Sequence, residues 1–390
     1  MLSKKSKLKQ IKPRSNSKKI KSLFLGMKIK EITDCIETLA PLSYAEDFDN
    51  VGLLVGDAQT KVTGVLVTLD TLEATVDEAI ENKCNLIVSF HPIIFSGLKK
   101  LNGATYVERV VLKAIKNDIA IYATHTALDN SFDGVNAKIC EVLGLTQREI
   151  LIPQKNTIKK LTTYVPTNAL EQVRNHLFEQ GAGSIGNYDH CSFTNLGTGT
   201  YKGNENSNPT IGEKGKLHTE EEVQLHVTFP KHLEGKIIKA LLASHPYEEV
   251  AYEVSLLENK NQHIGMGMVA ELETPMATEE FLALVKSKMN VSCIKHSAII
   301  NSQIKRVAVL GGSGSFATSY AIAKKADVYL SADFKYHDFY KAEGKILLAD
   351  IGHYESEQFT KNLLVDFLTE KFCNFAIILS NIHTNPIYYS

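Results

Sequence analysis

The strongest constraint on the fold is an alternation of amphipathic runs with short apolar runs, which is interrupted once. From Met27, helices are predicted at 27–42, 72–83 and 104–117, and buried strands at 62–70, 85–90 and 119–124. This order is typical of an α/β domain in which helices cover a parallel sheet.

The alternation resumes near Gly265 and continues toward the C-terminal end. Strands are predicted at 267–272, 306–312, 326–332, 345–350 and 374–380, and helices at 278–289, 315–325, 335–343 and 355–371. A chain of 390 residues exceeds the usual size of one compact domain. We therefore expect an α/β domain that is split in the sequence by an inserted domain.

The interrupting segment, residues 158–260, has a different order: strand, helix, two strands, helix, strand. This order suits a ferredoxin-like α+β domain. A polar loop containing Gly, Pro and Asn, residues 204–216, separates its halves. The expected boundaries are 27–154 for the first part of the core, 155–263 for the insert and 264–390 for the second part.

The segment 1–26 differs from the rest in charge. It carries nine Lys and Arg and no acid, whereas residues 27–390 carry 34 Lys and Arg against 44 Asp and Glu, a formal charge of −10. A basic patch that could neutralise nucleic-acid phosphates is confined to this segment, so nucleic acid is not the expected partner. Its Ser, Asn and Lys content predicts a disordered leader, and a basic interaction arm is the alternative.

Cysteine spacing and hydropathy predict where the protein works. The six cysteines are scattered singly, without the close pairs of a zinc knuckle or redox motif, which favours reduced thiols. No run approaches the roughly 20 apolar residues of a membrane span. With no signal-peptide pattern, we expect a cytoplasmic protein without a membrane partner.

Residues that can bind metals stand where several predicted strands end. His91 follows strand 85–90, His125 and Asp129 follow strand 119–124, and His353 and Glu357 follow strand 345–350. Ligands of open α/β sheets gather at the carboxyl ends of the strands. A single His, Asp or Glu after a strand is more often a capping or hydrogen-bonding residue. Three strand ends that each carry such residues together predict a divalent-metal site.

The spacing and chemistry of these residues narrow the choice of metal. His353 and Glu357 are four positions apart, so on a helix they share one face. Imidazole mixed with carboxylate favours zinc, manganese, iron, nickel or cobalt over calcium.

Three further motifs leave alternatives open. Residues 311–315 (GGSGS) could cradle a phosphate or form a tight turn between a strand and a helix. Asp333 and His337 could contact a substrate near the metals, or Asp333 could cap a helix. Residues 245–252 (HPYEEVAY) could hold a second metal, although a turn or subunit contact is the favoured interpretation.

Eight motifs occur in order between about Met27 and the C-terminal end: AEDFDNVGLLVGD (45–57), IVSFHPIIFSGLKKL (87–101), HTALDN, GAGSIGNYDHCSF (181–193), HPYEEVAY, VAVLGGSGS, SADFKYH and DIGHYESE (350–357). Together they closely resemble the GTP cyclohydrolase 1 type 2 homolog family, also called Nif-three-like proteins. The resemblance implies a two-lobed α/β core, an inserted ferredoxin-like domain, a dinuclear divalent-metal site and a homohexamer.

The resemblance also implies a ligand set. The metal ligands of the family fall on Phe90 and His91, on Asp129, and on His353 and Glu357. Phe90 departs from this pattern, because the usual residue is histidine and phenylalanine cannot bind a metal. One or two ions per subunit are therefore expected.

The implied activity is metal-dependent hydrolysis of a nucleotide or related small molecule. A bound cation lowers the pKa of its water toward about 7. In this hypothesis His125, Asp333 and His337 orient ligands or move protons, and His125 could complete the shell of a second ion. The chain shows no secure purine or triphosphate motif. The alternative is a metal-binding or metal-handling protein without turnover that acts through partner contacts.

Overall fold

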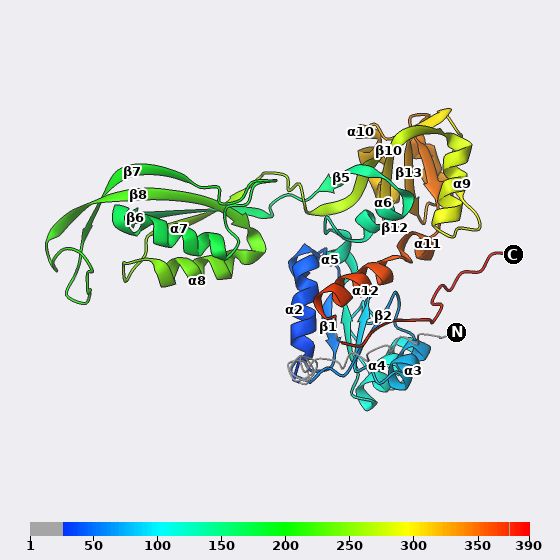
Figure 1. Cartoon of the computed structure of the whole chain (residues 1–390), viewed down its shortest axis with the longest axis horizontal. Coiled ribbons are helices and arrows are strands. Elements are labelled where there is room, and N and C mark those ends of the chain that lie inside the picture. Colours follow the sequence, from blue (N-terminus) through cyan, green and yellow to red (C-terminus); the bar gives the residue numbers. More distant parts are fainter. Residues whose placement is uncertain (1–25, 374) are drawn as a thin grey trace, which may run out of the picture.

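The computed structural model describes residues 26–373 and 375–390, which form three sheets. Two of the sheets lie close together, and the third stands to one side of them (Figure 1). The leader predicted at residues 1–26 lies, apart from Gly26, outside the described residues. Within those residues, no helix combines the length and the apolar character needed to cross a membrane.

The first sheet has five strands in the order β1-β4-β3-β2-β15. Its neighbours β4, β3, β2 and β15 are parallel, and β1 pairs with β4 in the antiparallel sense. The strands are β1 (Gly52–Val55), β2 (Val65–Thr68), β3 (Leu86–Ser89), β4 (Ala120–Ala123) and β15 (Ile377–Leu379). Every residue of β2, β3 and β4 is buried, as in parallel sheets covered on both faces.

Three helices of this part of the chain match the predicted runs: α2 (Ile29–Leu39), α3 (Glu73–Glu81) and α4 (Tyr106–Lys116). Further along the chain, α5 (His125–Asp129) and α6 (Val135–Leu143) were not predicted. Strand β1 was not predicted, because it is a four-residue edge strand with only two buried residues. The C-terminal β15 returns to pair with β2, so both ends of the described chain contribute to one sheet.

The second sheet has six strands in the order β11-β14-β13-β12-β10-β5. Strands β12, β13 and β14 are parallel, and the others join in the antiparallel sense. The strands are β5 (Thr146–Pro153), β10 (Gly265–Ala277), β11 (Lys295–His296), β12 (Gln303–Ser313), β13 (Val328–Ala332) and β14 (Leu347–Asp350). The sequence pattern did not predict β5, which is half exposed, or the two-residue β11.

Three predicted helices of this region differ in the structure. Residues Tyr336–Ala342 form a 3-10 helix, η5, and the run 315–325 contains the short helix α10 (Thr318–Ala323). The run 355–371 is divided into α11 (His353–Glu357) and α12 (Thr360–Lys371). Helix α11 begins earlier than predicted because Gly352, with φ +91°, permits a tight turn directly after β14. Helix α9 (Thr278–Lys288) matches its prediction.

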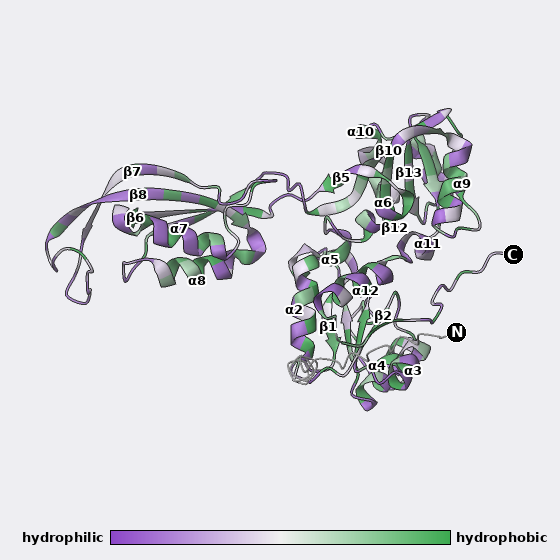
Figure 2. Cartoon of the chain, in the orientation of Figure 1, coloured by the Kyte–Doolittle hydropathy of each residue, from purple (hydrophilic) through white to green (hydrophobic). Residues whose placement is uncertain are grey.

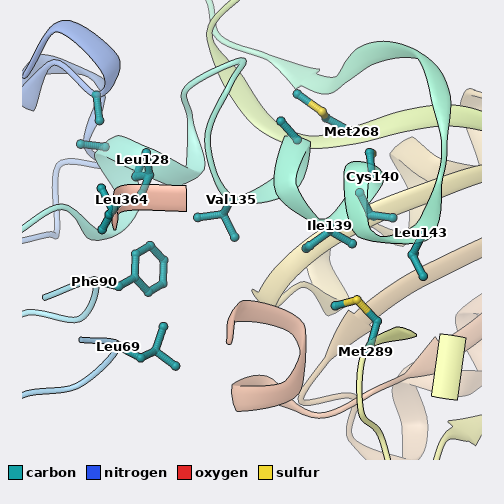
Figure 3. Packing of buried hydrophobic residues seen from close by; sticks show 14 of the residues in the cluster. Leu69, Phe90, Leu128, Val135, Ile139, Cys140, Leu143, Met268, Met289 and Leu364 are labelled. Atoms are coloured by element: carbon teal, nitrogen blue, oxygen red, sulfur yellow. The ribbon is translucent and has the colours of Figure 1, made fainter. Parts of the chain in front are cut away.

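One hydrophobic cluster connects the first two sheets. It extends from Leu69 and Phe90 beside β2 and β3, through Val135 and Ile139 of α6, to Met268 of β10 (Figure 3). Helix α12 closes it by packing on β2, β15 and α6. Because packed interiors resist deformation, this shared core fixes the strand ends of one sheet relative to those of the other.

The third sheet is antiparallel, with four strands in the order β7-β8-β6-β9. Its elements are β6 (Ile158–Pro166), α7 (Leu170–Glu179), β7 (Phe193–Lys202), β8 (Leu217–Pro230), α8 (Glu234–Ser244) and β9 (Tyr252–Leu257). Both helices pack on one face, through residues such as Val173, Leu225 and Ile237. The long strands β7 and β8 are largely hydrophilic along the part that leaves the helices (Figure 2).

Candidate metal centre

The centre is formed by two histidines, one from each of the first two sheets, and a glutamate between them. His91 follows β3, and His353 and Glu357 begin and end α11 after β14. The Nε2 atom of His91 lies 3.1 Å from Oε2 of Glu357, and Nε2 of His353 lies 3.3 Å from it. One ligand atom from each residue therefore falls within 4.8 Å of the others.

The other ring nitrogen of each histidine is bound to an aspartate. Nδ1 of His91 lies 2.8 Å from Oδ1 of Asp70, and Nδ1 of His353 lies 2.7 Å from Oδ2 of Asp333. A carboxylate that accepts a hydrogen bond from Nδ1 fixes the neutral tautomer with the Nε2 lone pair free, as in many metal sites. In the neutral form of each ring, the Nε2 lone pair is therefore on the side of Glu357.

Glu357 itself has an unsatisfied oxygen. Its Oε2 is buried and, among the described residues, forms no hydrogen bond, because the two histidine approaches are at ion-pair distance but are not aligned as hydrogen bonds. The neighbouring backbone leaves room for this carboxylate, since a Cβ atom at Gly312 would collide with Glu357 Oε1. A buried carboxylate oxygen without an aligned donor is stabilised by positive charge, which the two imidazoles supply when they are protonated and a metal ion supplies when they are neutral.

Asp129 supplies a second buried oxygen without a partner. It ends α5, and its Oδ1 forms no hydrogen bond within the described chain, although the residue as a whole keeps some exposure. Burial, together with the negative charge of Glu357, raises the pKa of Asp129 well above its usual value. Asp129 is not one of the three residues whose ligand atoms cluster.

The pKa values of the cluster show how its charges are shared without a cation. Burial would raise the pKa of Glu357, but His353 and His91 outweigh it and lower the pKa to about 2. Burial would lower the pKa of His91, but Asp70 and Glu357 raise it to about 10. Glu357, opposed by burial, raises the pKa of His353 to about 9. A metal ion must therefore displace protons from both imidazoles.

His125 borders the centre from the end of β4. Its Nδ1 lies 2.7 Å from Oδ1 of Asp49, and its ring centroid is 5.4 Å from that of His91. The other oxygen of Asp49 accepts hydrogen bonds from the backbone N–H and the hydroxyl of Thr126. His125 has φ +27°, an uncommon conformation for a residue other than glycine, in a segment held by these bonds.

Phe90 occupies the position where the family resemblance implies a ligand. The side chain is fully buried, and its ring centroid lies 4.9 Å from that of His91 and 5.6 Å from that of His125. Its ring belongs to the core that connects the two sheets, together with Leu69, Leu128 and Leu364 (Figure 3). It therefore supplies packing on one side of the two imidazoles and no donor atom.

The residues present fit a divalent metal ion. Two imidazole Nε2 atoms face a buried carboxylate oxygen that has no hydrogen-bond donor, and Asp129 holds a second such oxygen. This mixture of nitrogen and oxygen donors suits zinc, manganese, iron, nickel or cobalt.

The structure places the weaker candidates differently. His337 is exposed beside the rings of Tyr336 and Tyr340, and its assignment to the site stays a prediction. In the GGSGS motif, the N–H groups of Gly311 and Gly312 already donate to Asn136 and Ser356, which supports a structural strand end.

The motif 245–252 belongs to the third sheet. His245 Nε2 lies 2.9 Å from the carbonyl oxygen of Tyr164, and the backbone N–H of Tyr247 donates to His245 Nδ1, which supports a structural turn.

Three residues that support the centre were missed by the sequence reasoning. Asp70 ends the predicted strand 62–70, and Asp49 lies in the motif 45–57, but an aspartate at such places is also a common cap. Thr384, whose hydroxyl donates to Asp70 Oδ2 over 2.6 Å, carries no sequence signal of a role.

Comparison with known proteins agrees over nearly the whole chain. The model of the Duf34/NIF3 (NGG1p interacting factor 3) family matches residues 27–386. A Bacillus subtilis protein named GTP cyclohydrolase 1 type 2 homolog is 38% identical over 365 residues, which cover 92% of this chain and 98% of that protein. A Halalkalibacterium halodurans protein of the same name is 36% identical, with 92% and 98% covered.

Solved structures show the same fold. A Bacillus cereus protein related to NIF3 superposes with a TM-score of 0.81 at 36% identity, covering 94% of this chain and all of that one. A Staphylococcus aureus protein gives a TM-score of 0.74 at 31% identity, covering 93% and 99%. The motifs, the three-residue cluster and these matches agree, and the chain belongs to the Duf34/NIF3 family.

Proposed function

We propose that this protein binds a divalent metal ion through His91, His353 and Glu357, with Asp129 as a further ligand, and acts as a metal-dependent hydrolase. The observation that carries the proposal is the arrangement around Glu357, whose buried oxygen faces two imidazole nitrogens and has no hydrogen-bond donor. Such an arrangement leaves negative charge and lone pairs directed at one place, which a cation stabilises.

The surrounding residues have separate tasks in this proposal. Asp70 and Asp333 hold the two imidazoles in the tautomer that presents Nε2 to the centre. A divalent cation bound there supplies Lewis acidity and lowers the pKa of a coordinated water. His125, with Nδ1 held by Asp49, has Nε2 available to accept or deliver a proton at the substrate. Asp333 and His337 are proposed to assist at the same face.

The substrate class follows from the relatives by analogy. Those at 34–38% identity carry the name GTP cyclohydrolase 1 type 2 homolog, so we propose a nucleotide or a related small molecule as substrate. We further propose that residues 155–263 are an inserted ferredoxin-like domain between two parts of the core, 27–154 and 264–390, and that the subunits form a homohexamer.

A second function without turnover is favoured by Phe90. This residue is fully buried and offers no donor atom where a further ligand is expected. A centre that holds one ion tightly would suit a metal-binding or metal-handling protein that acts through partners.

Metal analysis combined with an activity screen tests the proposal. Purified protein should contain zinc, manganese, iron, nickel or cobalt, and should turn over GTP, other nucleotides or phosphoesters when that metal is supplied. The double variant Asp129→Ala with Glu357→Ala should lose both metal and turnover. Turnover that survives in this variant would refute the proposed centre, whereas bound metal without turnover supports the second function.

The variant Phe90→His tests the number of ions. If Phe90 removes a ligand, the histidine should raise the metal content by about one ion per subunit, measured by plasma emission spectrometry. Phe90→Leu serves as the control, because it changes the packing without adding a donor. An unchanged metal content in Phe90→His would show that the second position is lost for another reason.

A further inference from the structure

The third sheet contains a cavity that is separate from the metal centre. It has a volume of about 540 Å³ and is lined by β7, the start of the loop after it, the middle of β8 and residues 247–251. This volume lies within the range of small-molecule sites, roughly 300–1,000 Å³. In Figure 1 these strands lie on the far side of the molecule from α11, which carries His353 and Glu357.

Glu222 of β8 is the central polar group of the cavity. Glu222 is only 8% exposed, yet among the described residues no salt bridge neutralises its carboxylate. Oε1 accepts a hydrogen bond of 2.9 Å from the hydroxyl of Tyr247. Oε2 has no hydrogen-bond donor in the described part of the chain, so a nearly buried carboxylate retains an unused acceptor at the cavity wall.

The strand opposite Glu222 lacks side chains where the carboxylate lies. Gly197 pairs with Glu222 in the β7–β8 register, and a Cβ atom at Gly199 would collide with Glu222 Oε2. Both glycines line the cavity. Side chains at these positions would fill the space, so the glycines keep the carboxylate accessible from the cavity.

Aromatic rings and negative charge surround this carboxylate. Tyr164, Tyr201 and Tyr247 line the cavity, and the rings of Tyr201 and Tyr247 are 5.8 Å apart. The charged residues of the lining are three glutamates, Glu222, Glu248 and Glu249, and one lysine, Lys202. Tyrosine faces attract cations, and an unpaired carboxylate in a partly desolvated wall binds a charged donor strongly.

We propose that this cavity binds a small organic cation whose ammonium or guanidinium group donates to Glu222 Oε2 and whose remaining atoms lie against the tyrosines. Glu248 and Glu249 at the rim favour a ligand with a second positive charge. The site is independent of the metal centre and gives the third sheet a binding role of its own.

Calorimetric titration of the full-length protein with agmatine, which carries a guanidinium and an ammonium group, tests the proposal. Saturable binding at one site per subunit is expected, and Glu222→Gln should weaken it about tenfold or more, since a charged hydrogen bond is lost. Glu249→Gln should weaken agmatine binding severalfold. Because Glu249 is exposed, this second variant tests the site even if Glu222→Gln does not fold. Choline, whose quaternary ammonium group has no N–H to donate to Glu222, should bind at least tenfold more weakly.

Two controls separate this site from others. Glu221→Gln removes the same charge from the exposed neighbouring position of β8 and should leave agmatine affinity unchanged. Glu357→Gln, at the metal centre, should leave it unchanged as well. Absence of saturable agmatine binding, equal effects of Glu221→Gln and Glu222→Gln, or equal affinity for choline would overturn the proposal.

Discussion

The first and second sheets place the same pair of side chains at corresponding strand ends. In the first sheet, Asp70 follows β2 and His91 follows the parallel neighbour β3. In the second sheet, Asp333 follows β13 and His353 follows the parallel neighbour β14. Adjacent parallel strands end at one edge of a sheet, so in each sheet the aspartate after one strand meets the histidine after its neighbour.

The aspartate–histidine pairs of the two sheets differ in burial, and only the second sheet adds a glutamate. The side chain of His91 is 22% exposed and that of Asp70 is 31%, against 36% for His353 and 47% for Asp333. The second half also provides Glu357, which is 4% exposed and lies between both imidazoles. The centre thus depends on matched orienting pairs and on one unmatched carboxylate.

Removing the unmatched carboxylate should have the largest effect. Glu357→Gln keeps the shape but removes the charge that faces both imidazoles, and we expect zinc affinity to fall by on the order of a hundredfold or more, measured by competition with a chelating dye. Glu355→Gln is the matched control, because Glu355 is buried in the same helix but accepts from Asn385 instead. Equal losses in both variants would contradict the special position of Glu357.

The pH dependence of zinc binding tests whether His91 and His353 are both protonated in the metal-free protein. Without metal the pKa is raised to about 10 for His91 and about 9 for His353, so both are protonated at pH 7 and a metal must displace the protons. Between pH 6 and 8, zinc affinity should rise with pH by roughly tenfold to a hundredfold per unit, for one or two protons released. Calorimetry in buffers of different ionisation enthalpy counts these protons.

The metal-free protein should show the opposite trend in stability. A histidine whose pKa is raised by folding stabilises the folded state fully below its unfolded pKa of roughly 6.5, and this contribution is lost as pH rises through 9–10. A proton count near zero on zinc binding at pH 7 would contradict both expectations.

The matched pairs can be compared directly by removing one orienting carboxylate at a time. Asp70→Asn and Asp333→Asn should each reduce metal affinity by roughly 10–100-fold, because each frees an imidazole to rotate or change tautomer. Asp70→Asn should reduce metal affinity more than Asp333→Asn does, since the Asp70–His91 pair is less exposed than the Asp333–His353 pair. A larger loss of metal affinity in Asp333→Asn than in Asp70→Asn would contradict this expected order of the two aspartate–histidine pairs.

The smallest effect is expected one contact further from the centre. Thr384→Val removes the hydroxyl that donates to Asp70, and zinc affinity should fall about threefold to tenfold, less than the full contribution of a hydrogen bond to a charged group, because the hydroxyl acts on the metal only through Asp70 and His91. Thr384→Ser keeps the hydroxyl and should behave like the unaltered protein in the same titration. A loss in Thr384→Ser as large as that in Thr384→Val would point to packing instead of the hydrogen bond.

Much of this centre follows from patterns that a sequence carries. Short apolar runs locate the strand ends, and His353 and Glu357 four positions apart meet on one helical turn, with Nε2 and Oε2 3.3 Å apart. The grouping of His91 with these two residues depends on the shared core, which the sequence pattern does not describe.

Two of the three orienting aspartates could not be identified in the same way. Asp333 was a candidate from its position after a predicted strand, but Asp49 and Asp70 have local patterns that also fit a helix cap or turn, and their bonds to histidines 76 and 21 positions away arise from packing. Single-turn elements were also hard to predict, as the early start of α11 at His353 shows, because a glycine with positive φ decides it.

The return of the C-terminal region to the first sheet has a consequence for how the protein folds during synthesis. Strand β15 pairs with β2, and Thr384 reaches Asp70 across 314 positions of the sequence. Contacts of such separation form late, because a long loop must close first. Strands β2, β3 and β4 leave the ribosome well before β15, so the β2 edge stays unpaired until β15 follows and must be protected from other chains until then.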